Sequence, residues 1–407
     1  MFDTVPPRGY HAANVDLRGW DVATLRLKYG VISTDEHVQE APDLWTNRMS
    51  RARFGDEIPH IGERDGRQMW LLRGERLLKG RHYLAQVAAA MEPRNRDPVR
   101  WEDVPRKTYV PSERLKAMDL DGVDTHTFFP NVAGITNQHF QREGSEEFRL
   151  ACLRAYNDWL SEEWVAYSPR FIAQCIPPMW SVELAVGEIR RAVKNGHKAV
   201  VWHGAPEVLG FPHFQDRQWD PVYETCQELG LPLCLHLGAV PVLPPWEGYG
   251  LNTSTAMGST RAISIHEQVI ANVLFSGVFD RFPRLKSCTV ESGIGWIPYL
   301  LELADHEYHS LRCWEEGLRT KPSDAFRGHM WAPFWYERFA LKNRYDIGVD
   351  NIIYETDFPH PTSTWPNSRA CREESLKDVP SQERRKILWE NAAKLYRLDV
   401  DASALGG

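Results

Sequence analysis

The sequence predicts an α/β protein with a distorted (β/α)₈ barrel, the TIM-barrel architecture, and an insertion between the first and second strands. Short runs of β-branched and other apolar residues are continuous rather than alternating, as in parallel strands buried on both faces. Each run is followed by a helical pattern, and such units repeat along most of the 407 residues. A doubly wound open sheet uses the same units and is the second choice.

Seven strands are predicted from these apolar runs, and each ends in polar or charged residues. They are expected over residues 31–34, 122–129, 171–176, 197–202, 231–237, 285–290 and 351–355. An eighth strand is required to close the barrel. It is expected between residues 323 and 340, where the pattern is weak.

The segments between the strands carry helix signals. Ser145 precedes two glutamates and one apolar stripe that continues to Trp164, which indicates a capped amphipathic helix. Asp220-Pro221 begins another helix, which is expected to end near Gly230. Residues 182–193 and 381–397 are also predicted to be helical.

Two segments do not fit the strand–helix repeat. Residues 46–112 are polar and rich in arginine, and we expect an insertion over the barrel mouth that holds a hairpin of residues 68–72 and 75–78. Residues 238–262 are predicted to form a long, functional loop. The chain is therefore divided into an N-terminal extension (1–30), a catalytic barrel (31–400) and a tail (401–407).

Composition limits the partners of the protein. The formal net charge of −7 argues against nucleic acid, and no apolar run approaches the ~20 residues of a membrane span. The beginning of the sequence lacks a signal-peptide pattern, and the seven cysteines are scattered and odd in number. We therefore expect a cytoplasmic enzyme that binds a small molecule. The 16 tryptophans suit a large core or an aromatic cavity.

Histidines and carboxylates stand just after several predicted strands. Asp35 and His37 follow the first strand and, in extended backbone, point to the same side. His236, Glu291 and Asp357 end the fifth, sixth and last strands. In a barrel these ends meet at the active-site face, and such a set of nitrogen and oxygen ligands suits one divalent ion, Zn²⁺ or alternatively Mn²⁺ or Fe²⁺.

Further polar residues are candidates for contact with a substrate. His203 follows the fourth strand and His360 follows Asp357, and a structural role suits both equally well. Three arginines after the first strand are either carboxylate anchors or a solvated basic turn: Arg48, Arg51 and Arg53.

As a set, several motifs resemble the amidohydrolase-2 group, the branch of the amidohydrolase superfamily that contains amino-carboxymuconate-semialdehyde decarboxylase and γ-resorcylate decarboxylase. The resemblance runs from about residue 31 to residue 398, without the insertion. The motifs lie at residues 33–45, 119–124, 235–236, 275–285, 295–302 and, most specifically, 355–368 (ETDFPHPTSTWPNS).

The resemblance implies a distorted barrel with one divalent metal ion. By position, Asp35 and His37 match the first-strand ligands, His236 the fifth-strand ligand, and Asp357 the last-strand aspartate, which also acts as a base in related enzymes. The chain has Asp-x-His where most superfamily hydrolases have His-x-His, and Glu291 where the family usually has histidine. Glu291 is then an extra ligand or an acid/base. Relatives are often dimers or larger, which implies a homo-oligomer.

Three functions remain open at this point. In a decarboxylase the ion holds a substrate carboxylate, and Asp357 or Glu291 protonates the carbon that loses carbon dioxide; the acid-first motif slightly favours this reaction on an aromatic or cyclic substrate. In a hydrolase, Asp357 takes a proton from metal-bound water and Glu291 protonates the leaving group of an amide, ester or lactone. The third is an inactive barrel that acts as a binding protein, against which the complete ligand set argues.

Overall fold

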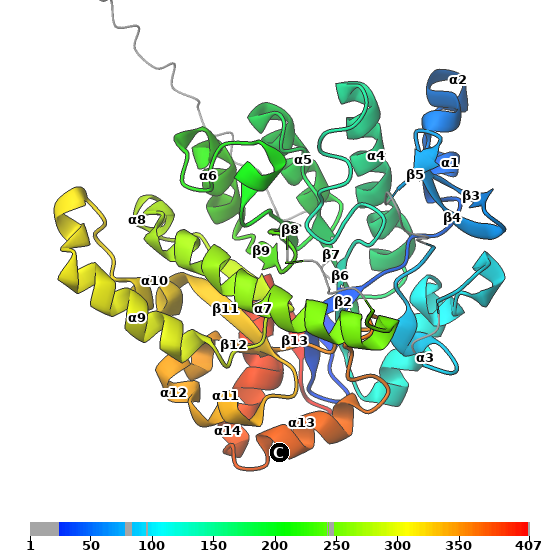
Figure 1. Cartoon of the computed structure of the whole chain (residues 1–407). Helices are drawn as coiled ribbons and strands as arrows, with labels where there is room; N and C mark the ends of the chain where they lie inside the picture. Colours follow the sequence, from blue (N-terminus) through cyan, green and yellow to red (C-terminus); the bar gives the residue numbers. More distant parts are fainter. Residues whose placement is uncertain (1–23, 78–83, 95–96, 242, 244–247, 406–407) are drawn as a thin grey trace, which may run out of the picture.

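The computed structural model describes residues 24–77, 84–94, 97–241, 243 and 248–405. Eight parallel strands close into a barrel, each beside the next in chain order and the last beside the first (Figure 1). The predicted (β/α)₈ fold is confirmed, including the eighth strand from the weak segment. The barrel strands are β2 (Ile32–His37), β6 (Thr125–Phe129), β7 (Phe171–Cys175), β8 (Ala199–Val201), β9 (Leu233–His236), β10 (Ser287–Val290), β11 (Met330–Phe334) and β12 (Ile352–Tyr354).

Helices surround the barrel, and the predicted helices are confirmed. The Ser145 hydroxyl accepts a hydrogen bond from the Phe148 amide and caps the first of them, and Gly230 ends another in left-handed backbone. The principal helices are α3 (Pro111–Asp121), α4 (Glu146–Trp159), α5 (Val182–Lys194), α6 (Asp220–Leu229), α7 (Leu251–Phe275), α8 (Val278–Arg281), α9 (Ile297–Ser310), α10 (Pro322–His329), α11 (Arg338–Lys342), α12 (Arg344–Ile347), α13 (Ser368–Leu376), α14 (Ser381–Arg385) and α15 (Asn391–Tyr396).

The prediction of one long loop over residues 238–262 is wrong for its second half, which is helical from Leu251 on. Helix α7 begins at Leu251 and crosses the face of the barrel seen in Figure 1. The serines, threonines and glycine that suggest a loop lie in its first half and are partly or fully exposed, whereas Val269, Ile270 and Val273 are buried. Packing of this second half overrides the weak helix propensity of the first. The residues of the loop at 242 and 244–247 lie outside the described part.

The stretch Asn252–Arg281, which contains most of α7, is long and apolar enough to cross a membrane by length and composition alone. Such a stretch was not expected from the sequence because polar residues interrupt the apolar ones. Core helices can meet the same criterion; here 39% of the apolar window is buried, and the second half of α7 contributes Ile270, Val273 and Leu274 to the core.

The insertion between β2 and β6 holds a three-stranded antiparallel sheet of β3 (His60–Arg64), β4 (Arg67–Leu72) and β5 (Glu75–Arg76). The predicted hairpin of residues 68–72 and 75–78 corresponds to β4 and β5; its last residue, 78, lies outside the described part. The second part of the same insertion contacts the segment after β12. The Ala89 amide donates to Pro359 O at 3.1 Å, and Arg94 donates to Trp365 O at 2.7 Å.

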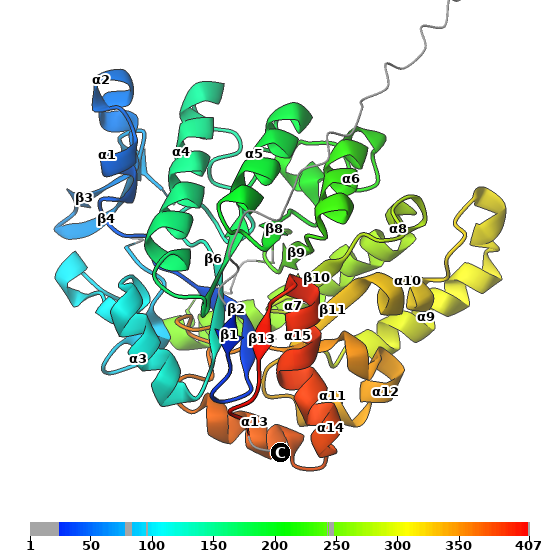
Figure 2. The same ribbon diagram turned by 180° about the vertical axis from the view of Figure 1, so that it is seen from behind.

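The tryptophans mostly build the core, which was the first of the two explanations for their number. Trp45, Trp70, Trp159, Trp164, Trp202 and Trp219 are fully buried. On the face of the barrel seen in Figure 2, a short parallel pair joins β1 (Leu25–Arg26) to β13 (Val400–Asp401). This pair ties both ends of the described chain to the N-terminal end of the barrel.

Candidate metal centre

The strand ends bring the predicted ligands together at the C-terminal mouth of the barrel. Asp35 and His37 lie in the last half of β2, and His236 is the last residue of β9. Glu291 and Asp357 follow β10 and β12 in left-handed backbone, with φ of 52° and 57°. This conformation is uncommon for residues other than glycine, and it tends to occur at functional sites.

The ligand atoms converge on one point. The Nε2 atoms of His37 and His236 are 3.3 Å apart, and Asp35 Oδ1 is 3.5 Å from the first and 3.6 Å from the second. Asp357 Oδ1 lies 3.6 Å from His37 Nε2, and Glu291 Oε2 lies 3.4 Å from His236 Nε2. Atoms that bind one ion at about 2.1 Å lie roughly 3 to 3.5 Å from one another. These residues therefore have the spacing of a shared divalent ion.

Unsatisfied oxygens support the same interpretation. Both carboxylate oxygens of Asp35 are buried without a hydrogen-bond partner among the described residues, and Oδ1 of Asp357 makes no hydrogen bond with them, although His360 Nδ1 lies 3.1 Å away. A buried carboxylate without partners is costly, unless a cation compensates its charge. The donor set of imidazole nitrogens and carboxylate oxygens fits a divalent ion such as Zn²⁺ or Mn²⁺.

The electrostatics are dominated by crowded acids. Burial, followed by the negative charges of Asp357 and Asp35, raises the pKa of Glu291 well above its usual value. Burial by itself would lower the pKa of His236, but the Asp35 carboxylate beside it raises that pKa overall. His37 lies between His360 and His236, and burial together with both neighbours lowers its pKa strongly.

His360 lies against the candidate ligands, whereas His203 does not. The rings of His360 and His37 stack with centroids 3.6 Å apart, and His360 Nδ1 is 3.1 Å from Asp357 Oδ1. Its Nε2 contacts Asn131 Oδ1 at 3.0 Å. His203 Nδ1 instead accepts the Ala205 amide at 3.2 Å, and burial lowers its pKa to about 4.

Two of the three arginines after the first strand, Arg48 and Arg53, form ion pairs with helix α4 and its continuation. Arg48 Nη2 is 2.9 Å from Glu162 and 2.8 Å from Glu163, and Arg53 pairs with Glu147. These ion pairs agree with the basic-turn interpretation of this segment. Arg51 is exposed.

Two buried glutamates at the site were not predicted. Glu355 Oε2 accepts the Glu291 amide at 3.2 Å, and burial, followed by the charges of Asp35, Asp357 and Glu291, raises its pKa well above the usual value. The period-two alternation that pairs Asp35 with His37 also pairs Glu355 with Asp357, so the sequence held a signal for it. No comparable spacing in the sequence indicates Glu36.

Glu36 lies behind the ligands and joins the two segments that bear them. It accepts the Thr356 hydroxyl at 2.5 Å and the Phe358 amide at 2.8 Å, on either side of Asp357. Arg114, which is fully buried, donates to His37 O at 2.7 Å and contacts His126 Nδ1 at 3.1 Å. We call Glu36, Arg114 and His126 the buried clamp.

Comparison with known families agrees with this geometry. The family model described as Amidohydrolase matches residues 50–398, most of the chain. The chain belongs to the amidohydrolase family. The resemblance in the sequence motifs is thereby confirmed.

Known relatives of this amidohydrolase include decarboxylases. The γ-resorcylate decarboxylase of Polaromonas sp. (strain JS666 / ATCC BAA-500) is 25% identical over 315 residues, which cover 71% of this chain and 88% of the relative. Among solved structures, the amidohydrolase map2389c of Mycobacterium avium subsp. paratuberculosis K-10 aligns with a TM-score of 0.70 and 24% identity, over 91% of this chain and 100% of that chain.

A second solved structure is the dihydroxybenzoic acid decarboxylase of Polaromonas sp. JS666 with bound manganese and the inhibitor 2-nitroresorcinol. It aligns with a TM-score of 0.60 and 19% identity, over 93% of this chain and 99% of that chain. At these identities the two structural likenesses show the common barrel fold.

Proposed function

We propose that this amidohydrolase is a metal-dependent carboxy-lyase that removes carbon dioxide from a small aromatic or cyclic carboxylate without oxidation. The observation that carries the proposal is the convergence of two imidazoles and three carboxylates, all buried, at the barrel mouth. The γ-resorcylate decarboxylase relative and the manganese-bound decarboxylase support this reaction class.

In the proposed site, Asp35, His37, His236 and Asp357 hold one divalent ion. Zn²⁺ suits this set, and Mn²⁺ and Fe²⁺ are alternatives, of which the decarboxylase from Polaromonas favours manganese. The ion would supply a positive charge that binds the substrate carboxylate and an adjacent oxygen and stabilises negative charge on the substrate. The unsatisfied oxygens of Asp35 and Asp357 favour this ligand set.

Glu291 is the proposed proton donor. It borders the ligands, and burial and its acidic neighbours favour its protonated form. The proton of Glu291 forms the new C–H bond at the carbon that bears the carboxylate. The C–C bond then breaks, its electron pair returns to the ring, and carbon dioxide leaves. Asp357 is the alternative donor, and His360 and His203 are proposed to contact the substrate.

The competing function is hydrolysis with Asp357 as the base. Its unsatisfied Oδ1 suits the acceptance of a proton from water, which is the observation that favours this alternative. Incubation of the metal-loaded enzyme with hydroxybenzoates in ¹⁸O-water separates the two. Carbon dioxide release without ¹⁸O in the organic product is expected. Incorporation of ¹⁸O into the organic product of an ester, lactone or amide would establish a hydrolase instead.

Metal analysis addresses the third alternative, a barrel without activity. Mild chelation, re-addition of Zn²⁺ or Mn²⁺ and measurement of bound metal should give about one ion per chain. A protein that binds no divalent ion would contradict the enzyme proposal in either form.

We also propose a cytoplasmic homo-oligomer that binds neither nucleic acid nor membrane. The seven cysteines are all free, as expected in a reducing compartment. Exposed apolar side chains on and beside α9 and α11, such as Tyr299, Leu303 and Phe339, suit contact with a second copy. Light scattering coupled to size exclusion should give a mass of at least two chains.

A further inference from the structure

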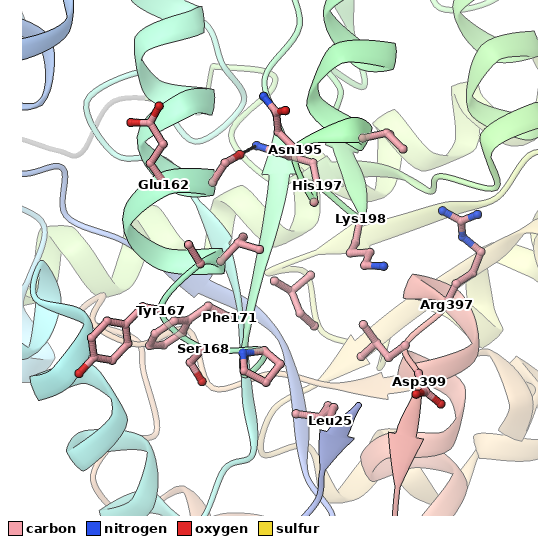
Figure 3. Close-up of a pocket in the computed structure, with 18 of the residues that line it drawn as sticks. Leu25, Glu162, Tyr167, Ser168, Phe171, Asn195, His197, Lys198, Arg397 and Asp399 are labelled. Carbon is pink, nitrogen blue, oxygen red and sulfur yellow. Dashed lines mark hydrogen bonds between the residues drawn. The ribbon is translucent and has the colours of Figure 1, made fainter. Parts of the chain in front are cut away.

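A large cavity lies at the opposite end of the barrel from the metal centre. It has a volume of about 690 Å³, within the range of small-molecule sites. Phe171, at the start of β7, and Lys198, just before β8, line it, so it opens at the N-terminal ends of the strands (Figure 3). None of the candidate metal ligands borders it. We call this cavity the basal groove.

The walls of the basal groove are largely apolar. Phe171 and Ile172 come from β7, Val193 from α5 and Leu398 from the segment before β13. Part of the remaining wall comes from the π-helical segment Leu160–Val165, which continues α4 and contributes Ser161, Glu162 and Val165. Such segments are rare and often lie at functional sites. The groove can therefore hold an apolar body of considerable size.

Two cations lie at one side of this apolar groove. The ammonium of Lys198 and the guanidinium of Arg397 extend on the same side in Figure 3. Among the described residues, neither head group has an ion pair or a hydrogen bond. Burial lowers the pKa of both groups, and the positive charge of Arg397 lowers that of Lys198 further. Two adjacent cations without a counter-charge favour an anion.

The carboxylates of the basal groove do not supply that counter-charge. Asp158 pairs with Arg191, and Glu162 lies 2.9 Å from Arg48. Asp399 accepts the Thr24 hydroxyl at 2.5 Å. Asp158 and Glu162 are therefore compensated by arginines outside the pair Lys198 and Arg397, and Asp399 has its hydrogen bond with Thr24 instead of with either cation.

The position of Arg397 is fixed by its surroundings. It ends α15 in left-handed backbone with φ of 51°. Its side chain passes over Gly230, where an added Cβ would lie 3.2 Å from Arg397 Cδ. Glycine thus leaves the space in which the stem of this arginine lies.

We propose that the basal groove binds an organic anion whose carboxylate lies between Lys198 and Arg397 and whose apolar body packs on Phe171, Val193 and Leu398. The body is an alkyl chain or a fused ring system, because the groove exceeds the size of one benzene ring. This site is separate from the metal centre and does not depend on the reaction proposed there.

The test uses the fluorescent sulfonate 1-anilinonaphthalene-8-sulfonate as the probe on the full-length protein. Decanoate and 2-naphthoate serve as competitors and distinguish an alkyl from a fused-ring ligand; at least one should displace the probe. Inorganic phosphate should not displace it, since phosphate lacks the apolar body. The double variant K198A/R397A should bind the probe about tenfold more weakly or worse, because charge-assisted hydrogen bonds are lost.

Two comparisons control this experiment. The double variant R338A/K377A also removes one arginine and one lysine, but at an exposed position where both pair with Glu374. It should bind the probe as the wild type does. K198R should retain most of the affinity. A loosened fold exposes apolar surface and binds more probe, so partial unfolding cannot imitate the expected loss. Equal affinity of K198A/R397A and wild type, or an equal loss in R338A/K377A, would overturn the proposal.

Discussion

At the scale of single residues, Glu291 gives the first prediction, through its proposed role as the proton donor. Its carboxylate is 3.4 Å from His236 Nε2, at the position where relatives are expected to have histidine. In Glu291→Gln the side chain keeps its size but no longer holds a proton to donate. We expect kcat for decarboxylation to fall about 10²- to 10⁴-fold, with one metal ion still bound.

The control for this prediction is Glu302→Gln, which makes the same change at an exposed position on α9. It should leave kcat unchanged. Activity of Glu291→Gln close to that of the wild type would remove Glu291 from both the decarboxylase and the hydrolase mechanism.

Glu40 gives a second prediction at this scale, on stability against pH. It is fully buried, accepts the amides of Asn131 and Val132, and burial raises its pKa to about 7. The folded state therefore binds more protons than the unfolded state between pH ~4.5 and ~7. Stability from this group is complete below pH ~4.5 and is lost as the pH rises towards 7.

Glu40→Gln should remove that loss, because the amide keeps an acceptor and does not ionise. Between pH 5 and pH 8 the free energy of unfolding of the wild type should fall by ~2.5 kcal/mol through this group, and that of the variant should not. Urea titrations of metal-free protein at both pH values measure the difference. If the difference in free energy of unfolding between Glu40→Gln and the wild type is the same at both pH values, the raised pKa does not belong to Glu40.

The limits of sequence reasoning also begin at single residues. Asp35 and His37 were readable from their spacing, and His236 from its place at a strand end. The left-handed backbone of Glu291 and Asp357 was not readable, because it depends on contacts from distant segments. Glu36 was missed for a similar reason: its partners are Thr356 and Phe358, far away in the sequence.

At the scale of elements, the barrel strands with a continuous apolar run were predicted well and irregular segments poorly. The barrel strands are buried on both faces, so seven of them carry a clear apolar signal, whereas β11 carries a weak one. Helix α7 carries a misleading one, since its first half is rich in small polar residues and only tertiary packing makes it helical. The buried clamp likewise arises only when the ends of β2 and β12 meet.

The clamp yields a prediction about metal affinity. Glu36 binds both neighbours of Asp357, so Glu36→Gln should loosen that aspartate and weaken Mn²⁺ binding about 10- to 100-fold without removal of a ligand. Titration followed by electron paramagnetic resonance of free Mn²⁺ measures the affinity directly.

The matched control for the clamp is Thr34→Val on the same strand. The Thr34 hydroxyl donates to Tyr354 O at 3.0 Å and thus joins β2 to β12 without contact to the segment of Asp357. The Thr34→Val variant should retain the Mn²⁺ affinity of the wild type. If Glu36→Gln also retains that affinity, the clamp does not position the ligand.

At the scale of the whole molecule, closure of the barrel is what makes the metal centre. The proposed ligands come from β2, β9 and the segment after β12, so the centre exists only when the first and last strands pair. A divalent ion should therefore bind the folded state far better than the unfolded chain, and its binding energy should add to the stability of the barrel.

This argument predicts the effect of metal removal. At a free Mn²⁺ concentration of about 100 times Kd, the ion adds ~2.7 kcal/mol to the free energy of unfolding. For a chain of this length that corresponds to a rise in Tm of about 3 °C, which scanning calorimetry resolves. Because His236 supplies one ligand from β9, His236→Ala should show little or no rise over the same titration. An equal rise in both proteins would place the ion elsewhere than at the barrel mouth.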